Sequence, residues 1–213
     1  MKKLIPLLMA SLFACWSCEL KDTYTQTNVR DMVNVKGDNL VNDFGYTLNV
    51  VEDAVGAAKW KVDGARYYAV YDILNRNLDI RLKETHRATI QEADELADAE
   101  QLSKDPVLLT LEGICGGYIN LGFSITRQKN SNFAHVLRFH YKVENNYMKL
   151  YVEHEGNGED EAHMESSELV TEDLMFSIPM EEFPYFSSLG IVLNVIATEG
   201  DKIVVKEETI NLY

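Results

Sequence analysis

An acidic segment between residues 153 and 163 holds the densest set of side chains able to do chemistry. Two histidines, His154 and His163, and five carboxylates lie within these eleven residues, and together they could hold a cation. Their spacing fits no common motif, because the second histidine of a helical zinc site and the regular acidic positions of a calcium-binding EF loop are missing. The pair Asn157-Gly158 favours a turn, so we expect a solvated loop and no metal site.

A second candidate is the polar face of a strand predicted near residues 136–143. Arg138, His140 and Lys142 alternate with apolar residues, so all three fall on one face and could receive an anion or a partner's carboxylate. The polar faces of sandwich strands usually lie in solvent, and we expect the same here. His86 stands alone between predicted strands and suggests no role.

Arrangements typical of catalysis are missing from the sequence. There is no Gly-x-Ser-x-Gly elbow, no phosphate-binding glycine loop and no Cys-His pair in a recognisable context. Cys115 fits a small core residue better than a nucleophile. The adjacent Gly116-Gly117 predicts a bend or a close approach of two backbone segments. We therefore expect no catalytic residue, no cofactor and no enzymatic activity.

Aromatic residues gather in the first half of the chain, at Trp60, Tyr67, Tyr68 and Tyr71. Alternating tyrosines most often pack in a core, but an aromatic face can also stack against neutral glycans. Nucleic acid is disfavoured, because the 20 basic and 34 acidic residues give a net charge of −14, whereas phosphate contacts need clustered Lys and Arg.

The first residues predict an export signal. Lys2 and Lys3 precede an apolar run that is too short to span a bilayer, and a cysteine follows small residues at its end. This pattern is typical of a bacterial lipoprotein signal, in which the cysteine becomes the lipidated first residue. Cys15 fits the lipobox better by its flanking residues, whereas Cys18 stands directly before a polar run, and we favour Cys18.

The expected product is an outer-membrane lipoprotein of the cell envelope, facing either the periplasm or the medium. Residues 1–17 are the predicted signal peptide, and the threonine-rich residues 18–31 are a polar tether. With Cys18 lipidated, Cys115 is the one remaining cysteine, so no disulfide can form within the chain.

Residues 32–104 predict a small β-barrel. The expected strands are Val33–Lys36, Tyr46–Glu52, Arg66–Leu74, Leu78–Lys83 and Arg87–Gln91, most of which alternate apolar and polar residues. Five short strands in so few residues suit a barrel. Residues 91–104 lack β-branched side chains and predict a short helix or a solvated linker, and Asp105-Pro106 then marks the domain border.

Residues 105–213 predict a β-sandwich. The expected strands are 118–125, 136–143, 147–152, 174–178, 191–198 and 203–210, with turns at Asn145-Asn146 and Gly200-Asp201. Several alternating strands without a long helix are typical of two packed sheets.

Several short signatures along the chain resemble the NigD-like lipoprotein family of Bacteroides-type bacteria. They are Trp60-Lys61-Val62-Asp63-Gly64-Ala65-Arg66, Tyr71-Asp72-Ile73-Leu74-Asn75, Asp105-Pro106, Gly116-Gly117-Tyr118-Ile119-Asn120-Leu121 and His154-Glu155-Gly156-Asn157-Gly158. The resemblance covers nearly everything after the signal and implies an N-terminal OB-like domain followed by a β-sandwich. It implies no catalytic or ligand-binding residues, and the family takes its name from a bacteriocin-associated gene cluster.

The function expected from these observations is binding. We expect a lipid-anchored module that binds or assembles with another envelope protein, with a bacteriocin-related partner as one form of it. A surface lipoprotein that binds glycans through an aromatic face is the alternative. The sequence does not choose between them.

Overall fold

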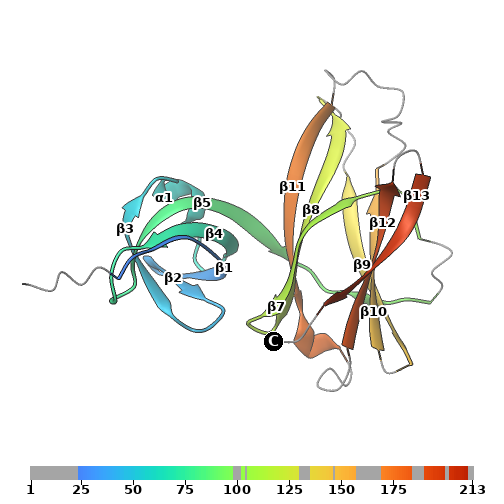
Figure 1. The fold of residues 1–213 in the computed structure, drawn as a ribbon, viewed down its shortest axis with the longest axis horizontal. Coiled ribbons are helices and arrows are strands. Elements are labelled where there is room, and N and C mark those ends of the chain that lie inside the picture. Colours follow the sequence, from blue (N-terminus) through green and yellow to red (C-terminus); the bar gives the residue numbers. More distant parts are fainter. Residues whose placement is uncertain are drawn as a thin grey trace, which may run out of the picture.

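The computed structural model describes residues 24–97, 102–103, 105–129, 135–145, 147–156, 169–183, 190–199 and 202–210. Most of them lie in β-strands, which form a small barrel followed by a larger sandwich of two sheets (Figure 1). The predicted all-β class, with a barrel before a sandwich, is confirmed. In this described part, no helix has the length and apolar character needed to cross a membrane.

The barrel consists of five strands and one helical turn. They are β1 (Gln26–Lys36), β2 (Asn39–Asn42), β3 (Thr47–Asp53), α1 (Ala57–Trp60), β4 (Arg66–Ile73) and β5 (Asp79–Ile90). The sheet order is β3-β2-β1-β4-β5, and parallel pairing of β3 with β5 closes the barrel. A closed five-stranded barrel with a helix between its third and fourth strands is the OB-like arrangement that the sequence predicts.

The core of the barrel takes most of the aromatic cluster. Tyr67 and Tyr71 project inward from β4 and are buried, because alternate residues of a strand face one side of the sheet. Trp60 at the end of α1 is also buried, and its indole N–H donates to Oδ2 of Asp53 at 2.9 Å. Tyr68 lies on the opposite, outer face of β4 and is half-buried. An aromatic surface made of all four residues therefore does not exist.

The sandwich is built from the remaining strands. They are β6 (Asp94–Glu95), β7 (Leu108–Cys115), β8 (Tyr118–Gln128), β9 (Val136–Glu144), β10 (Tyr147–Glu155), β11 (Leu169–Pro179), β12 (Gly190–Glu199) and β13 (Lys202–Ile210). One layer is β11-β8-β7 and the other is β13-β12-β10-β9-β6. Alternate residues of both layers form the core, where Phe139 meets Phe123 and Phe176 with ring centroids 6.1 and 5.1 Å apart.

One long strand joins the two parts. β5 pairs with β4 inside the barrel, and its last residues, Ala88 to Ile90, pair in parallel with Met175 to Ser177 of β11. The barrel sheet and one layer of the sandwich are thus a single eight-stranded sheet, which Figure 1 shows bending between the two parts. The sequence predicted two separate strands here, at residues 78–83 and 87–91. Glu84, Thr85 and His86, which lie between these two predicted strands, belong to one continuous strand in the structure.

Two further segments differ from expectation. β1 begins at Gln26, inside the predicted tether, and its first residues are polar because their side chains are exposed. Residues 91–104 were expected to form a short helix or a solvated linker, but their described part contains β6, which pairs in parallel with β9. Leu96 in the same part is buried, and its N–H donates to the carbonyl of Tyr141 at 2.8 Å. A strand of two residues is too short to show an alternation in sequence.

Candidate binding site between barrel and sandwich

Two tight turns meet where the barrel touches the sandwich. The turn between β7 and β8 contains Gly116 and Gly117, at φ of 60° and 80°, in the left-handed region that favours glycine. The turn after β2 carries Asp43. A Cβ atom added to Gly116 would lie 2.5 Å from Cγ of Asp43, so only glycine fits this contact. The glycine pair forms the bend that the sequence predicted, and the close contact at Gly116 is with the Asp43 side chain.

The fully buried Arg66 of β4 crosses this junction. Its guanidinium donates to both carboxylate oxygens of Asp43, at 2.7 and 2.6 Å, and the two side chains are only 0% and 4% exposed. Nη2 also donates to Oδ1 of Asn120 at 3.1 Å, and Nε donates to Oγ of Ser177 at 2.8 Å. The ring of Tyr118 lies 4.3 Å from Cζ of Arg66. Arg66 and Asp43 belong to the barrel and the other three to the sandwich, so this network fixes one part against the other.

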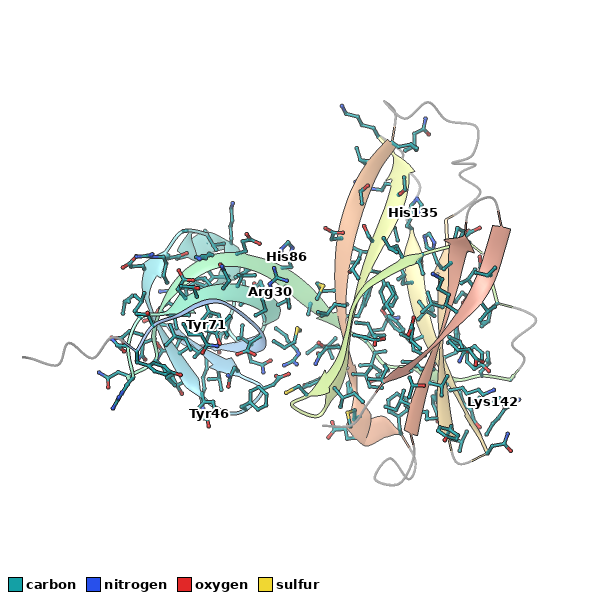
Figure 2. All side chains as sticks on the ribbon, in the orientation of Figure 1. Arg30, Tyr46, Tyr71, His86, His135 and Lys142 are labelled. Carbon is teal, nitrogen blue, oxygen red and sulfur yellow. The ribbon has the colours of Figure 1, made fainter. Side chains whose placement is uncertain are left out.

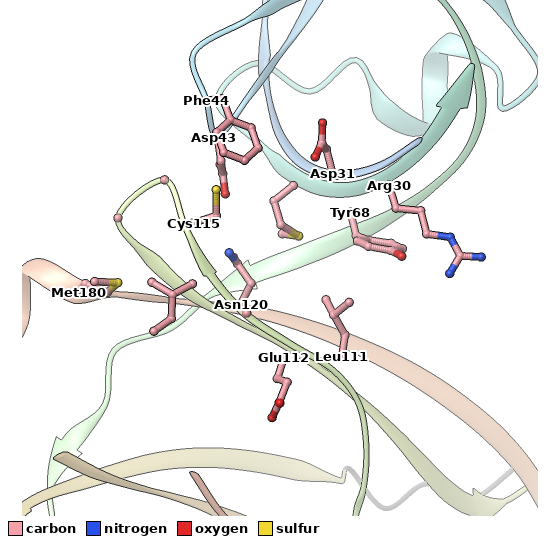
Figure 3. A pocket seen from close by; sticks show the side chains of 15 residues that line it. Arg30, Asp31, Asp43, Phe44, Tyr68, Leu111, Glu112, Cys115, Asn120 and Met180 are labelled. Atoms are coloured by element: carbon pink, nitrogen blue, oxygen red, sulfur yellow. The ribbon is translucent and has the colours of Figure 1, made fainter. Parts of the chain in front are cut away.

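A pocket of about 650 Å³ opens beside this network (Figure 3). Its walls come from β1, β4 and the turn after β2 on the barrel side, and from β7, β8 and Met180 on the sandwich side. Most of its surface is apolar, contributed by Met32, Phe44, Tyr68, Leu111, Ile114, Cys115 and Met180. An open, largely apolar pocket at a domain junction, with a few polar groups, is typical of a binding site.

Phe44 and Arg30 lie at the edge of the pocket with exposed side chains. The Phe44 side chain is 69% exposed, although a large apolar residue gains from burial. The guanidinium of Arg30 has no hydrogen-bond or ion-pair partner among the residues that the structure describes. Neither residue belongs to a motif in the sequence. Phe44 could have been noticed, because it stands inside the polar turn Asn42-Asp43-Phe44-Gly45.

Two of the three carboxylates that line the pocket are already engaged, and the third, that of Glu112, points away from the other labelled side chains (Figure 3). Asp43 pairs with Arg66, and Oδ2 of Asp31 accepts hydrogen bonds from the Tyr71 hydroxyl at 2.6 Å and from Nδ2 of Asn42 at 3.2 Å. Burial, followed by the negative charges of Asp43 and Asp31, raises the pKa of the Cys115 thiol. This thiol therefore stays protonated at neutral pH, which makes it a poor nucleophile.

The acidic segment of residues 153–163 lies partly outside the described residues, which end at Gly156 before the next strand. Residues 153–155 belong to β10, and His154 is only 2% exposed, so the expectation of a solvated loop is wrong at this end. The predicted turn at Gly200-Asp201 also falls outside the described residues. Within the described ranges, no three His, Cys, Asp or Glu side chains are arranged to hold a metal ion.

His154 of β10 is hydrogen-bonded to His135, which stands directly before β9 and is labelled in Figure 2. Nδ1 of His154 lies 2.8 Å from the carbonyl oxygen of Pro106, which can only accept, so Nδ1 carries a proton. Nε2 of the neutral His154 ring is then an acceptor, and it lies 2.9 Å from Nδ1 of His135, which must donate. The neighbouring N–H of Gly156 donates to Asp105 at 2.7 Å. The pair thus helps to hold the start of the sandwich, at residues 105–106, on the end of β10.

The protein is expected to lose stability as the pH falls from 7.5 to 5.5. Burial, and to a lesser extent His135, lowers the pKa of His154 below its ordinary value of 6.5 despite opposing effects of Pro106 and Asp105. Between this lowered pKa and about 6.5, His154 is protonated in the unfolded chain but not in the folded protein, so each pH unit of acidification lowers the free energy of unfolding by up to about 1.4 kcal/mol. Urea unfolding across this pH range should show a smaller slope in His154→Gln, and no such change in His86→Gln, which alters an exposed histidine. An unchanged slope in His154→Gln would contradict the assignment.

The predicted polar face of β9 is occupied by ion pairs. Arg138 donates to Glu155 at 2.8 Å, Nε2 of His140 lies 3.1 Å from Glu153, and Lys142 lies 2.6 Å from Glu144. These glutamates already satisfy the positive charges, so this face does not offer an open anion site.

The fold is shared with several solved structures of proteins from Bacteroides species. A protein of unknown function from Bacteroides vulgatus has a TM-score of 0.63 at 19% identity, covering 87% of this chain and 91% of that one. A NigD-like immunity protein from Bacteroides caccae has a TM-score of 0.59 at 18% identity, covering 86% and 92%. A candidate lipoprotein from Bacteroides fragilis has a TM-score of 0.52 at 13% identity, covering 87% and 97%. No family model and no curated protein sequence matches the chain.

These likenesses extend over the barrel and the sandwich together, since each covers more than four-fifths of both chains. At identities below 20% they establish a common fold and do not transfer a function. The resemblance to the NigD-like lipoproteins that the sequence indicates is thereby confirmed as a shared fold.

Proposed function

We propose that this protein is a lipid-anchored, non-catalytic binding module of the cell envelope, and that it holds another envelope protein in the pocket between barrel and sandwich. The observation that carries the proposal is a preformed apolar pocket at a junction fixed by buried contacts. The shared strand β5 and the network around Arg66 support this rigidity. A site that does not have to be ordered on binding retains more of its interaction free energy.

The side chains of the pocket favour binding over catalysis. A general acid or base needs a titratable group that is free to exchange a proton with its substrate. Here the Asp43 carboxylate is paired with Arg66, Asp31 is hydrogen-bonded to Tyr71, and the Cys115 thiol is held protonated. The remaining carboxylate, that of Glu112, points away from the other labelled side chains of the pocket (Figure 3). No cofactor is needed for the binding that we propose.

The kind of partner is suggested by one of the similar structures, which is named an immunity protein. An envelope protein that binds a bacteriocin or another toxin would suit a lipid-anchored module of this shape. We include such a partner in the proposal as one form of the same protein-binding function.

A surface glycan is the second candidate, supported by the exposed Phe44 and the half-buried Tyr68 at the pocket. Aromatic rings stack on neutral sugars without any positive charge. Binding to a glycan array that disappears in Tyr68→Ala would favour this reading, and an array without signal would exclude it. Trp60→Ala is not a usable test, because Trp60 is in the barrel core.

The protein partner can be sought by photo-crosslinking in living cells. A benzoylphenylalanine placed at Phe44 should give one discrete protein adduct on illumination, because this position lies at the rim of the pocket. The same probe at Val51, which is 56% exposed on β3 and outside the pocket, is the control. Equal adducts at both positions, or none at Phe44, would contradict a protein partner at this pocket.

The lipid anchor is tested separately. Replacing both Cys15 and Cys18 with alanine should release the protein from membranes and abolish labelling with a radioactive fatty acid, because the acyl chains hold the protein on the bilayer. Single replacements show which cysteine is used. Continued acyl labelling of the double variant would refute the anchor. Protease treatment of intact cells, with a periplasmic marker protein as control, then shows whether the outer-membrane lipoprotein faces the medium or the periplasm.

A further inference from the structure

Asn120 of β8 is a buried residue with an unused hydrogen-bond donor. It is 3% exposed, and its Oδ1 accepts hydrogen bonds from Nη2 of Arg66 at 3.1 Å and from Oγ of Ser177 at 2.7 Å. Because a guanidinium can only donate, the amide oxygen must face Arg66, and the NH₂ group must point the other way. Figure 3 shows this nitrogen directed into the pocket.

Nδ2 of Asn120 donates no hydrogen bond to any of the residues that the structure describes. Buried polar groups of native proteins nearly always have a partner, and those without one in the chain are satisfied by water or by a ligand. This donor therefore calls for an acceptor atom inside the pocket.

The rest of the pocket restricts what can carry that acceptor. Its floor includes Met32, Tyr68 and Leu111, which pack with the small apolar cluster that joins barrel and sandwich. Thioether and aliphatic side chains adapt to apolar groups of varied shape but offer no strong hydrogen bonds. A sugar would lose the hydration of several hydroxyls against this wall without gaining partners.

The charge of the pocket also disfavours an anionic group deep inside it. The positive charge of Arg66 is used by Asp43, and the carboxylates of Asp31 and Glu112 line the same pocket. Arg30 is at the edge, where its charge is exposed to solvent. An uncharged carbonyl oxygen is the acceptor that suits both the Asn120 donor and these surroundings.

We propose that the pocket takes an apolar side chain of a partner polypeptide and that the Asn120 NH₂ group donates to a carbonyl oxygen of the same segment. This inference rests on the proposed protein-binding function and specifies the chemical groups of the partner that the pocket recognises. A peptide presents an apolar side chain and a main-chain carbonyl side by side, which matches an apolar floor with one buried donor.

The test is a selection of random displayed twelve-residue peptides on the full chain in mild detergent, followed by affinity measurements on variants. Selected peptides should share an apolar residue such as Met, Leu or Phe. Their affinity should fall at least tenfold in Asn120→Asp, which keeps the oxygen that faces Arg66 and Ser177 but presents an acceptor to the pocket. The matched control is Asn34→Asp, because Asn34 also accepts from Arg66, at 3.4 Å, but does not line the pocket, and it should retain affinity within twofold.

The outcomes separate this inference from the broader function. Peptides whose affinity is equal in Asn120→Asp and wild type would show that water satisfies the donor, and would overturn the inference even if the Phe44 crosslink is found. Failure to enrich any peptide would overturn it as well. If neutral oligosaccharides such as maltose or chitobiose bind to the wild type and this binding disappears in Asn120→Asp, the ligand of the pocket is a glycan and the peptide inference is wrong. If the Phe44 crosslink is missing and the selected peptides bind outside the pocket, the proposed protein-binding function is contradicted as well.

Discussion

Replacing Arg66 with methionine is expected to lower the free energy of unfolding by about 3–5 kcal/mol, because it leaves a buried carboxylate without its partner. The Asp43 carboxylate, whose side chain is 4% exposed, would stay buried and would no longer accept hydrogen bonds from a guanidinium. Asn120 and Ser177 would lose their contacts with the same group, so both parts of the molecule are affected.

Urea unfolding of the full chain can measure this loss. Trp60 is one of two tryptophans in the sequence, and the other, Trp16, lies in the predicted signal peptide, so fluorescence of the processed chain reports on the barrel. Arg138→Met is the matched control, because Arg138 and Glu155 form an exposed ion pair, which is worth at most about 1 kcal/mol. The double variant Arg66→Met/Asp43→Leu should recover much of the stability, since no charge is then left buried. Equal losses in Arg66→Met and Arg138→Met would contradict the role given to Arg66.

Gly116→Ala is expected to cost about 3 kcal/mol, roughly 2 kcal/mol more than Gly117→Ala. Both glycines have positive φ, so alanine at either position carries the strain of a left-handed backbone. Only at Gly116 would the added Cβ meet another group, at 2.5 Å from Cγ of Asp43, whereas nothing lies within 4 Å of a Cβ at Gly117. The clash would push Asp43 away from Arg66 or separate the two turns.

The difference between the two variants, measured by urea unfolding under identical conditions, isolates the contact between the turns from the strain of the backbone. Equal losses would show that the turns can separate without cost. The Phe44 crosslink should weaken in Gly116→Ala and persist in Gly117→Ala, because Phe44 is adjacent to the displaced Asp43.

The sequence predicted well those strands that have one face in a core and the other in solvent. β8, β9 and β10 alternate through residues such as Leu121, Phe139 and Leu150, and each was placed within a few residues of its observed bounds. The pattern is visible because burial repeats every second residue along a strand. Short or exposed strands escaped the same reasoning, since β2, β6 and the start of β1 bury too few residues to show a period.

The ends of a strand were predicted least well where the strand passes from the core of the barrel to the junction with the sandwich. β5 buries Ile80 and Leu82 in the barrel and Ala88 at the junction, with polar residues between them. The sequence predicted two separate strands here. In the fold the polar stretch still pairs with β4, since backbone hydrogen bonds do not depend on whether the side chains are buried.

The amino-acid sequence by itself determined the all-β class, the order of barrel and sandwich, most strands and the tight turn at Gly116-Gly117, because these follow from local periodicity and backbone preference. Only the tertiary structure decided the pocket. Arg66 lies 23 residues from Asp43, 54 from Asn120 and 111 from Ser177, and no local pattern links residues so far apart. Their charges and donors acquire a role once the two parts pack together, since burial makes the loss of one member of a salt bridge costly and leaves one amide donor without a partner.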